Sequence, residues 1–227
     1  MKGKLIVIDG LDGSGKATQS GILCDELNKN GIKARKISFP NYGKKGCSLV
    51  EMYLNGELSD NPEDINGYAS SVFFAADRYT SFITEWKNDY DNGTVIVLDR
   101  YTTSNAVHQM SKLVKSEWDG FIDWLFDFEY NKLSLPAPDA VIYLDMDIDI
   151  SQKLLSQRYS GDESKKDIHE KSLSYIKACR PAALYAAEKL NWSVINCCSG
   201  NKVLTIEEIA QKIKSSFNDL KLLDKEI

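Results

Sequence analysis

The most informative segment of this sequence is the glycine-rich run from Gly10 to Lys16, which reads Gly-Leu-Asp-Gly-Ser-Gly-Lys. It follows a short apolar stretch and precedes a helical pattern, which is the context of a phosphate-binding loop. Glycines here allow several backbone N–H groups to point at one anion, the helix start adds partial positive charge, and Lys16 would reach the β and γ phosphates of a nucleotide. The predicted ATP site also contains Leu11, Asp12, Gly13, Ser14, Gly15, Ala17 and Thr18.

The position that usually meets a metal ion departs from the general pattern of such loops. Ala17 stands where a Ser or Thr hydroxyl commonly contacts Mg²⁺, and the hydroxyl comes one residue later, at Thr18. We therefore expect Mg²⁺ to be held mainly by ATP oxygens and water, with a carboxylate nearby. Asp99 ends the apolar run that begins at Val95, and it is the predicted carboxylate, acting through water.

Two more charged residues stand at or near the ends of apolar runs. Arg100 follows Asp99 and can clamp a phosphate with two parallel hydrogen bonds, although a salt bridge at a strand end is an equal alternative. Asp145 ends the run that begins at Ala140 and competes with Asp99 for the place beside the loop. Because prolines precede its run, we expect Asp145 to be structural or to lie near the adenine.

These residues must be positioned by a sheet, and the sequence predicts one. Five short apolar runs rich in β-branched residues lie at Leu5 to Ile8, Ala34 to Phe39, Val95 to Leu98, Ala140 to Leu144 and Val194 to Ile195. Each is short enough to be a strand buried on both faces, and stretches with helical spacing separate them. Strands that alternate with helices indicate a parallel sheet in an α/β fold.

Three of the intervening stretches have distinct signals. Most of the span from Asn61 to Asn92 is predicted to be one long helix that opens at Asn61-Pro62. The span from Ile168 to Leu190 contains Pro181, which should kink a helix or start a new one. From Tyr159 to Asp167 the chain is almost wholly polar and predicts a surface loop.

Composition narrows the classes of partner. The chain has 227 residues and a net charge of -5, which argues against a nucleic-acid partner because such binding depends on Lys and Arg.

One domain is the default at this length. No segment approaches the roughly 20 apolar residues of a membrane-spanning helix, and the apolar start is too short for a secretory leader. The cysteines are odd in number and contain no C-x-x-C pair, which favours reduced thiols in the cytoplasm.

Four motifs, in this order and at fitting separations, resemble the thymidylate kinase family. They are Gly10-Leu-Asp-Gly-Ser-Gly-Lys-Ala-Thr-Gln19, Phe39-Pro40, Phe74-Ala-Ala-Asp-Arg78 and Asp99-Arg-Tyr-Thr-Thr-Ser104. The resemblance covers essentially the whole chain. It implies a P-loop kinase of three layers in one domain over residues 1–227, with a five-stranded parallel sheet flanked by helices and a short lid at about residues 158–167. It also implies a cytoplasmic, homodimeric enzyme that uses Mg²⁺ and moves the γ-phosphoryl group of ATP to a deoxynucleoside monophosphate, with dTMP as the expected acceptor.

The resemblance assigns roles to residues of the acceptor site. Phe74 is similar to the aromatic residue that stacks on thymine and Arg78 to the arginine at the pyrimidine edge, and residues four apart share one helix face. Arg100 resembles the arginine that binds the acceptor phosphate, and Asp12 resembles the loop acid that meets the 3′-hydroxyl. The other expected substrate contacts are Pro40, Tyr101, Ser104, His108 and Gln109.

Three positions depart from the family pattern. Tyr42 stands where many members have an arginine for the acceptor phosphate, so either Lys44 or Lys45 replaces that contact or the contact is absent. His108 stands where an aromatic residue is common, which bears on the distinction between deoxyribose and ribose. Gly13 stands where some relatives place an arginine.

Relatives that lack an arginine in the phosphate loop form the other branch of the family, and there the catalytic arginine comes from the lid. This implies a catalytic role for Arg158, with Lys165 and Lys166 as helpers, although a solvated basic run explains the two lysines equally well. The predicted catalytic set is therefore Lys16, Asp99, Arg100 and Arg158.

Two other functions fit parts of the pattern. A deoxynucleoside kinase would need a carboxylate base for its neutral hydroxyl acceptor, whereas a monophosphate acceptor is already anionic. A regulatory module would bind ATP without turning over any monophosphate. A guanine-nucleotide switch is not indicated, because none of the Asn-Lys pairs at residues 28, 131 and 201 continues as Asn-Lys-x-Asp.

Overall fold

A parallel five-stranded sheet forms the centre of the computed structural model, which describes residues 2–162, 166–200 and 202–219. Its strands are β1 (Leu5–Gly10), β2 (Ala34–Ser38), β3 (Val95–Asp99), β4 (Ala140–Asp145) and β5 (Ser193–Asn196). They lie in the order β2-β3-β1-β4-β5, and each neighbouring pair is parallel. The five predicted strands are confirmed, with ends that differ by one or two residues. A further pair of short strands, β6 (Cys198–Ser199) and β7 (Lys202–Val203), is antiparallel.

Helices connect the strands and cover the sheet. They are α1 (Lys16–Lys29), α2 (Ser48–Leu54), α3 (Gly67–Ser81), α4 (Lys87–Asp91), α5 (Thr103–His108), α6 (Trp118–Phe126), α7 (Ile148–Arg158), α8 (Ile168–Lys171), α9 (Leu173–Lys189) and α10 (Ile206–Asp219). Short 3-10 turns are η1 (Lys45–Cys47), η3 (Met110–Lys112) and η4 (Lys115–Glu117), and π-helical segments are η2 (Phe82–Trp86) and η5 (Asp127–Lys132).

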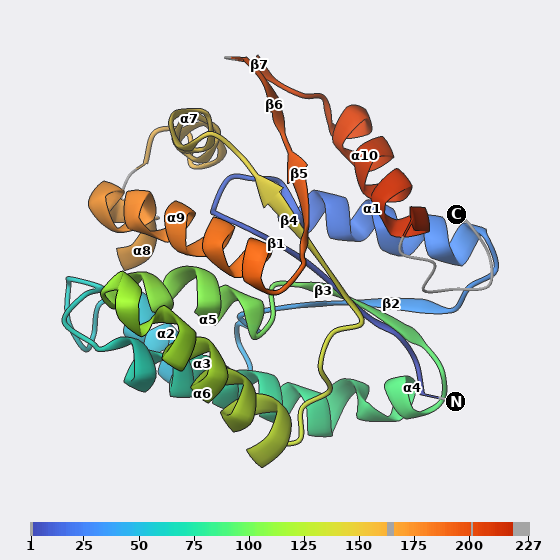
Figure 1. Ribbon diagram of the computed structural model, residues 1–227, viewed down its shortest axis with the longest axis horizontal. Helices are drawn as coiled ribbons and strands as arrows, with labels where there is room; N and C mark the ends of the chain where they lie inside the picture. Colours follow the sequence, from blue (N-terminus) through green and yellow to red (C-terminus); the bar gives the residue numbers. More distant parts are fainter. Residues whose placement is uncertain (1, 163–165, 201, 220–227) are drawn as a thin grey trace.

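Both faces of the sheet are apolar and are covered by helices, so the fold has three layers. Successive side chains of a strand point to opposite faces. In β1, Leu5 and Val7 pack with residues of α5, α6 and α9, whereas Ile6 and Ile8 pack with residues of α1 and α10. Figure 1 shows these two groups of helices on the two sides of the strands. Because every residue of β1 and β3 is buried, the loops that follow these strands start from a rigid base.

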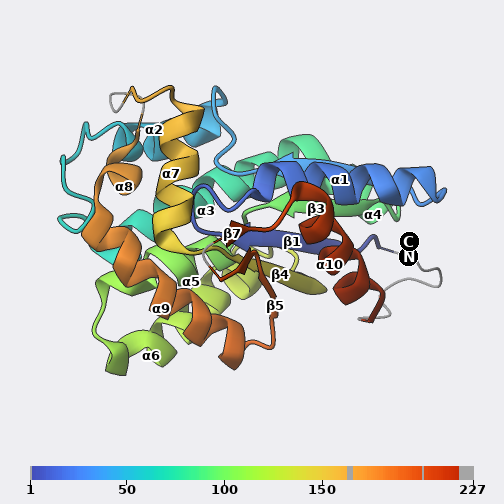
Figure 2. The same ribbon diagram turned by 90° about the horizontal axis from the view of Figure 1, so that it is seen from above.

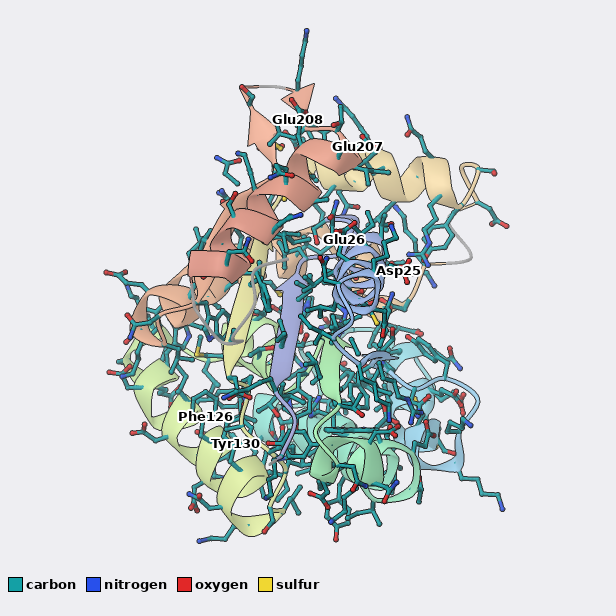
Figure 3. All side chains as sticks on the ribbon, turned by 90° about the vertical axis from the view of Figure 1, so that its right-hand side faces the viewer. Asp25, Glu26, Phe126, Tyr130, Glu207 and Glu208 are labelled. Carbon is teal, nitrogen blue, oxygen red and sulfur yellow. The ribbon has the colours of Figure 1, made fainter. Side chains whose placement is uncertain are left out.

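Labelled side chains mark the two outer layers. Figure 3 places Glu26 of α1 and Glu207 of α10 on one side of the sheet and Phe126 and Tyr130, at the end of α6 and in η5, on the other. The rings of Phe126 and Tyr130 have centroids 5.0 Å apart and pack against the larger apolar cluster.

None of the helices in the described part of the chain combines the length and apolar character needed to cross a membrane. The cysteines all fall within the described residues and are free thiols.

Two helix starts differ from those predicted. The long helix begins at Gly67 rather than at Asn61-Pro62, because the Asn66 side chain accepts a hydrogen bond of 2.8 Å from the Ala69 N–H. From there it continues through η2 into α4, as the periodicity predicted. Pro181 lies inside α9 and starts no helix. The break lies at Ser172, whose hydroxyl caps the first turn of α9.

The segments that could bind a ligand or take part in a reaction follow the carboxyl ends of the strands. Parallel strands present their carboxyl ends at one edge of a sheet, where α/β proteins bind ligands. The loop from Gly10 to Gly15 follows β1, and Asp99 and Arg100 end and follow β3. Figure 2 shows α2, α7 and α8 grouped beyond one end of the sheet. The fold therefore builds a covered space at this edge.

Candidate active site

One cavity of about 760 Å³ brings the predicted motifs together. Its wall is formed by the phosphate loop, the segment after β2, and parts of α3, α5, α7 and α8. The predicted site residues in this wall are Asp12, Gly13, Gly15, Lys16, Ala17, Thr18, Pro40, Phe74, Arg78, Asp99, Arg100, Tyr101, Ser104, His108, Gln109 and Arg158. Three loop residues, Gly10, Leu11 and Ser14, are buried behind this surface instead. Both ends of the predicted transfer site thus face one space.

The lysine of the phosphate loop is buried and turned back on the loop. Lys16 Nζ donates to the Leu11 carbonyl oxygen at 2.8 Å and lies 3.7 Å from Asp12 Oδ1. Burial, followed by the charge of Arg100, lowers the pKa of Lys16. For Asp12, burial alone would raise the pKa, but Arg100 and Lys16 outweigh it and hold the pKa well below its ordinary value. The loop therefore carries an ionised acid between two basic side chains.

Helix α7 packs closely against the loop at Gly13. This residue has a φ of +81°, and a Cβ added there would lie 2.6 Å from the Ser151 carbonyl oxygen of α7. Gly15, in contrast, adopts the left-handed conformation before α1 with open space where a Cβ would be. Both the backbone angle and the lack of space require glycine at position 13. This steric restriction explains why the chain does not have the arginine that some relatives place here.

The two strand-end acids have different surroundings. Asp99 is in register with Ile8 of β1, beside the phosphate loop, and its side chain is buried in the cavity wall. Asp145 makes two hydrogen bonds of 2.8 Å to the guanidinium of Arg180. Asp145 is therefore structural, and Asp99 is the strand-end acid next to the loop.

The residues around Asp99 suit a metal ion that arrives with its nucleotide. Within residues 2–162, 166–200 and 202–219, no group of three or more His, Cys, Asp or Glu side chains could hold a metal ion. Mg²⁺ keeps several waters and needs few protein oxygens when phosphates supply the others. The single Asp99 carboxylate, beside a loop with Ala17 in place of a hydroxyl, fits this kind of site.

Asp9 is a site residue that the sequence did not single out. It is the next-to-last residue of β1, is fully buried, and accepts hydrogen bonds from the Thr103 hydroxyl (2.5 Å), the Ser104 hydroxyl (2.8 Å) and the Gly10 N–H (2.8 Å). It joins the phosphate loop to the first turn of α5. Its available signal was its position, as the last residue before the glycine run.

Arg100 projects from a strained backbone into the space between the loop and α5. Its φ is +68°, a left-handed conformation that is uncommon for residues other than glycine. One guanidinium nitrogen, Nη2, pairs with Asp12, while Nη1 donates to His108 Nε2 at 3.1 Å and to the Ser104 hydroxyl at 3.4 Å. Burial lowers the pKa of Arg100, but the charges of Asp12 and Asp9 exceed that effect and raise it. The guanidinium is a permanent cation beside the phosphate loop.

His108 and His169 form a pair of rings beneath Arg100. Their planes differ by 17° with centroids 5.7 Å apart, and both residues line the cavity. Burial, together with the charge of Arg100, lowers the pKa of His108 to about 3. His169 was not predicted; it comes from α8, after the lid, and lies 2.8 Å from the Tyr53 hydroxyl of α2. These rings connect the lid side of the molecule to α2 and α5.

The far end of the cavity contains a fully buried ion pair. Arg78 Nε and Nη2 donate to the two carboxylate oxygens of Glu129 at 2.7 and 2.5 Å, and neither side chain is more than 2 % exposed. Glu129 also accepts from Thr102 at 2.7 Å and from Asn105 at 3.2 Å. The third nitrogen of Arg78, Nη1, makes a weaker contact of 3.4 Å with the Tyr101 carbonyl oxygen. Sequence reasoning missed Glu129.

The other predicted substrate contacts at this end are mixed. Phe74 lies in the same wall as Arg78, and its ring packs edge-on against Tyr53. The Gln109 side-chain oxygen accepts from the Ser70 hydroxyl at 2.7 Å. Tyr101 also lines the cavity, its ring packs on Phe39 and its hydroxyl donates to the Pro136 carbonyl oxygen; its place near the sugar stays a prediction.

Of the two alternatives for the arginine that Tyr42 replaces, the structure favours an absent contact. Lys44 and Lys45 are exposed and do not contribute to the cavity wall, and Lys44 Nζ instead lies 3.7 Å from Glu85. Tyr42 itself faces the cavity. The η1 turn that contains Lys45 directs the backbone toward α2 rather than toward the phosphate loop.

The lid is anchored at both described ends. Arg158, the last residue of α7, is exposed and reaches the cavity wall, as does Lys166 beyond the undescribed residues 163–165. Lys165 lies outside the described residues. The Tyr159 hydroxyl donates to Glu170 at 3.0 Å, and Asp167 with Glu170 forms a reciprocal cap at the start of α8.

Comparisons with known proteins identify the family of this chain. The family model described as thymidylate kinase matches residues 8–213. Among curated proteins, the chain is 27% identical over 226 residues to a putative thymidylate kinase of Invertebrate iridescent virus 6, with 98% of this chain and 94% of that protein covered. It is 28% identical to the thymidylate kinase of Mycobacterium tuberculosis, with 80% and 84% covered. The structure of thymidylate kinase from Candida albicans superposes with a TM-score of 0.68 at 22% identity, covering 100% of this chain and 97% of that one.

Proposed function

This chain belongs to the thymidylate kinase family, and we propose that it transfers the γ-phosphoryl group of ATP to dTMP, giving dTDP and ADP. The observation that carries the proposal is the single cavity that joins the phosphate loop to Arg100 and then to Phe74 and Arg78. Such a cavity holds a donor phosphate chain and an acceptor nucleotide end to end. Positioning and charge stabilisation are the main sources of catalysis in phosphoryl transfer.

The donor half uses the loop amides and Lys16. Lys16 must leave the Leu11 carbonyl oxygen to contact the β and γ phosphates. Although its pKa is lowered, Lys16 remains the cationic donor of the loop when phosphate oxygens lie next to it. Bound Mg²⁺ would supply further neutralisation of the phosphates, and Asp99 is the residue that would hold it through water. No covalent intermediate on the protein is needed.

The acceptor half uses Arg100 for the phosphate. Its Nη1 donates to the neutral His108 and Ser104 and lies 3.9 Å from Asp9, so Nη2 is the nitrogen that an anion can take over from Asp12. Asp12 would then be free to turn toward the acceptor sugar when the phosphate takes its place on Nη2. The acceptor phosphate is anionic at neutral pH, and therefore no general base is required.

The base end suits a flat, neutral ring. Phe74 offers an aromatic surface, and Arg78 Nη1 is a donor with a weak partner that a carbonyl oxygen of thymine can replace. The charge of Arg78 is balanced by Glu129, which disfavours an anionic group at this position. Arg158 would close over the transferring group from the end of α7, with Lys166 in support.

The quaternary state and location belong to the same proposal. An exposed apolar stripe, formed by Tyr68, Val72, Tyr79 and Ile83, follows one side of α3 into η2 and suits a symmetric contact with a second copy. Free buried thiols fit the reducing cytoplasm. Light scattering should give a dimer mass for the whole single-domain chain, and Val72→Asp should shift it to the monomer mass. A monomeric wild type would remove the dimer from the proposal.

Acceptor identity is tested by ADP release with a panel of acceptors. We expect dTMP to give the highest kcat/KM against uridine, cytidine and guanosine monophosphates, and thymidine to be inactive. A guanosine monophosphate preference would overturn the base-end assignment while leaving the phosphate chemistry intact. Activity with thymidine but not dTMP would identify a deoxynucleoside kinase. ATP binding without turnover of any acceptor would identify a regulatory module.

A further inference from the structure

His108 and Arg100 form a side-chain contact that the overall reaction does not explain. We propose that His108 is a positioning residue for this kinase, a neutral hydrogen-bond acceptor, fixed in one tautomer, that aims the Arg100 guanidinium at the acceptor phosphate. The proposal rests on the proposed function. It concerns how Arg100 is held, and His108 itself need not touch the phosphate.

The direction of the contact follows from the chemistry of the two groups. Arginine is always protonated and its nitrogens only donate, so His108 Nε2, 3.1 Å from Arg100 Nη1, must accept. The ring proton is therefore on Nδ1, which faces the Cys179 sulfur at 3.6 Å. Geometry thus selects the Nδ1–H tautomer of a neutral imidazole.

The imidazole is held from several sides. Its backbone carbonyl accepts hydrogen bonds from the Tyr175 hydroxyl at 2.7 Å and the Ser111 hydroxyl at 2.8 Å. Its ring stacks on His169, and Cys179 of α9 closes the Nδ1 side. A ring fixed in this way can orient a guanidinium that leaves a strained backbone position.

A neutral acceptor offers something that a carboxylate would not. The Nη2 side of Arg100 already faces the charge of Asp12, and Asp9 lies 3.9 Å from Nη1. A further carboxylate at position 108 would pair with Nη1 and neutralise more of the guanidinium charge that attracts the phosphate to Nη2. A neutral nitrogen holds the same atom in place and leaves the positive charge available.

The surroundings keep the ring uncharged at working pH. Burial and the Arg100 charge both oppose protonation and bring the pKa of His108 to about 3. The charged and titratable groups that face it from the neighbouring elements are Arg100, Asp12, Lys16, Lys112, His169, Tyr175 and Cys179.

Three substitutions separate hydrogen bonding, charge and ring shape. His108→Phe keeps a ring that can stack on His169 but removes the acceptor. His108→Gln removes the ring but places an amide oxygen near the Nε2 position, and His108→Glu has the shape of Gln with a negative charge. The readouts are kcat/KM for dTMP, KM for ATP, the dissociation constant of dTMP alone by calorimetry, and the melting temperature.

We expect the Gln variant to have a kcat/KM for dTMP about 10-fold or more above those of both the Phe and the Glu variants, since a hydrogen bond to a charged group is worth about 10- to 100-fold. The dissociation constant of dTMP should follow the same order, with KM for ATP nearly constant. In an Arg100→Lys background the difference between Phe and Gln should shrink to about 2-fold. If Phe equals or exceeds Gln, the ring has a packing role and the proposal is wrong. Should Phe fail to fold, the Gln and Glu pair decides alone.

A spectroscopic measurement tests the tautomer without any turnover. The chain has two histidines, so ¹⁵N labelling of histidine gives two ring systems, and the spectrum of His108→Gln identifies that of His108. We expect protonated Nδ1 and unprotonated Nε2 for His108. A protonated Nε2 would overturn the inference even if dTMP kinase activity is normal. Conversely, a chain that binds dTMP with the expected order of variants but does not turn it over would refute the proposed function and leave this inference standing.

Discussion

Two arginines line the same cavity, and their surroundings differ in charge and exposure. Arg78 is fully buried and makes two hydrogen bonds to Glu129, so its charge is balanced within the protein. Arg100 shares its guanidinium between Asp12 and the neutral groups of His108 and Ser104, and 14% of its side chain is exposed. The first arrangement suits a neutral base, and the second suits an exchangeable anion. The same residue type can therefore serve as a fixed wall or as a ligand clamp, depending on its carboxylate partners.

If the base-end pair is a wall, breaking it should cost stability. Glu129→Gln leaves the buried Arg78 charge uncompensated, and we expect a loss of about 3–5 kcal/mol in the free energy of unfolding by denaturant titration. The control is Asp145→Asn, because Asp145 makes an equivalent two-bond pair with a half-exposed Arg180 and should lose about 1 kcal/mol or less. Equal losses in the two variants would contradict the contrast between buried and exposed pairs.

At the phosphate end the cost should appear in turnover. Lys16→Met removes the loop's cationic donor, and we expect kcat to fall by about 10²- to 10³-fold with little change in melting temperature. Lys177→Met, at an exposed position of α9, is the control and should retain activity. Near-normal turnover of the Lys16 variant would remove this residue from the catalytic set.

A conservative change distinguishes the two arginines directly. Arg100→Lys should lower kcat/KM for dTMP by about 10- to 100-fold, because an ammonium cannot keep both the Asp12 and the His108 contacts while binding phosphate. Arg78→Lys should instead lower the melting temperature, because one of its two bonds to Glu129 is lost. Steady-state kinetics and thermal unfolding on both variants decide the matter. The assignment fails if the two variants exchange these phenotypes.

The smallest effect concerns acid. His108 has a folded pKa of about 3 against an ordinary value of 6.5, so between these values the unfolded chain binds a proton that the folded chain does not. Stability is therefore lost as the pH falls through this window. Relative to His108→Gln, the wild type should lose about 1.6 kcal/mol of unfolding free energy between pH 6.5 and pH 5. The contribution of Asp167 is common to both proteins and cancels, whereas that of His169 also changes because His108 is one of the groups that lower its pKa. Parallel pH curves would show that His108 is not held neutral.

Much of this contrast was accessible from the sequence. The apolar runs predicted the five strands, because a parallel sheet buried on both faces requires continuous apolar residues. Lys16, Asp99 and Arg100 were accessible because strand ends and glycine spacing are local properties of the chain. The three residues line one cavity, and their catalytic roles stay predictions.

The site residues that the sequence did not predict are those whose role depends on contacts with distant segments of the chain. Glu129 pairs with Arg78 across 51 residues, and His169 meets Tyr53 across 116. A glutamate in an aromatic stretch or a lone histidine after a polar loop has no local pattern that predicts burial against a charge. The same limit explains Lys44 and Lys45, whose charges suggested a phosphate contact that the course of the chain after β2 does not permit.

The close packing of α7 on Gly13 has a consequence for how this lineage can change. An arginine at position 13 would have to displace the Ser151 backbone, and Ser151 belongs to the helix that ends in Arg158. The loop arginine and this placement of the lid helix are therefore alternatives that exclude each other. A gene encoding this protein could not acquire the loop arginine through one tolerated substitution, because the helix would have to be repositioned in the same event.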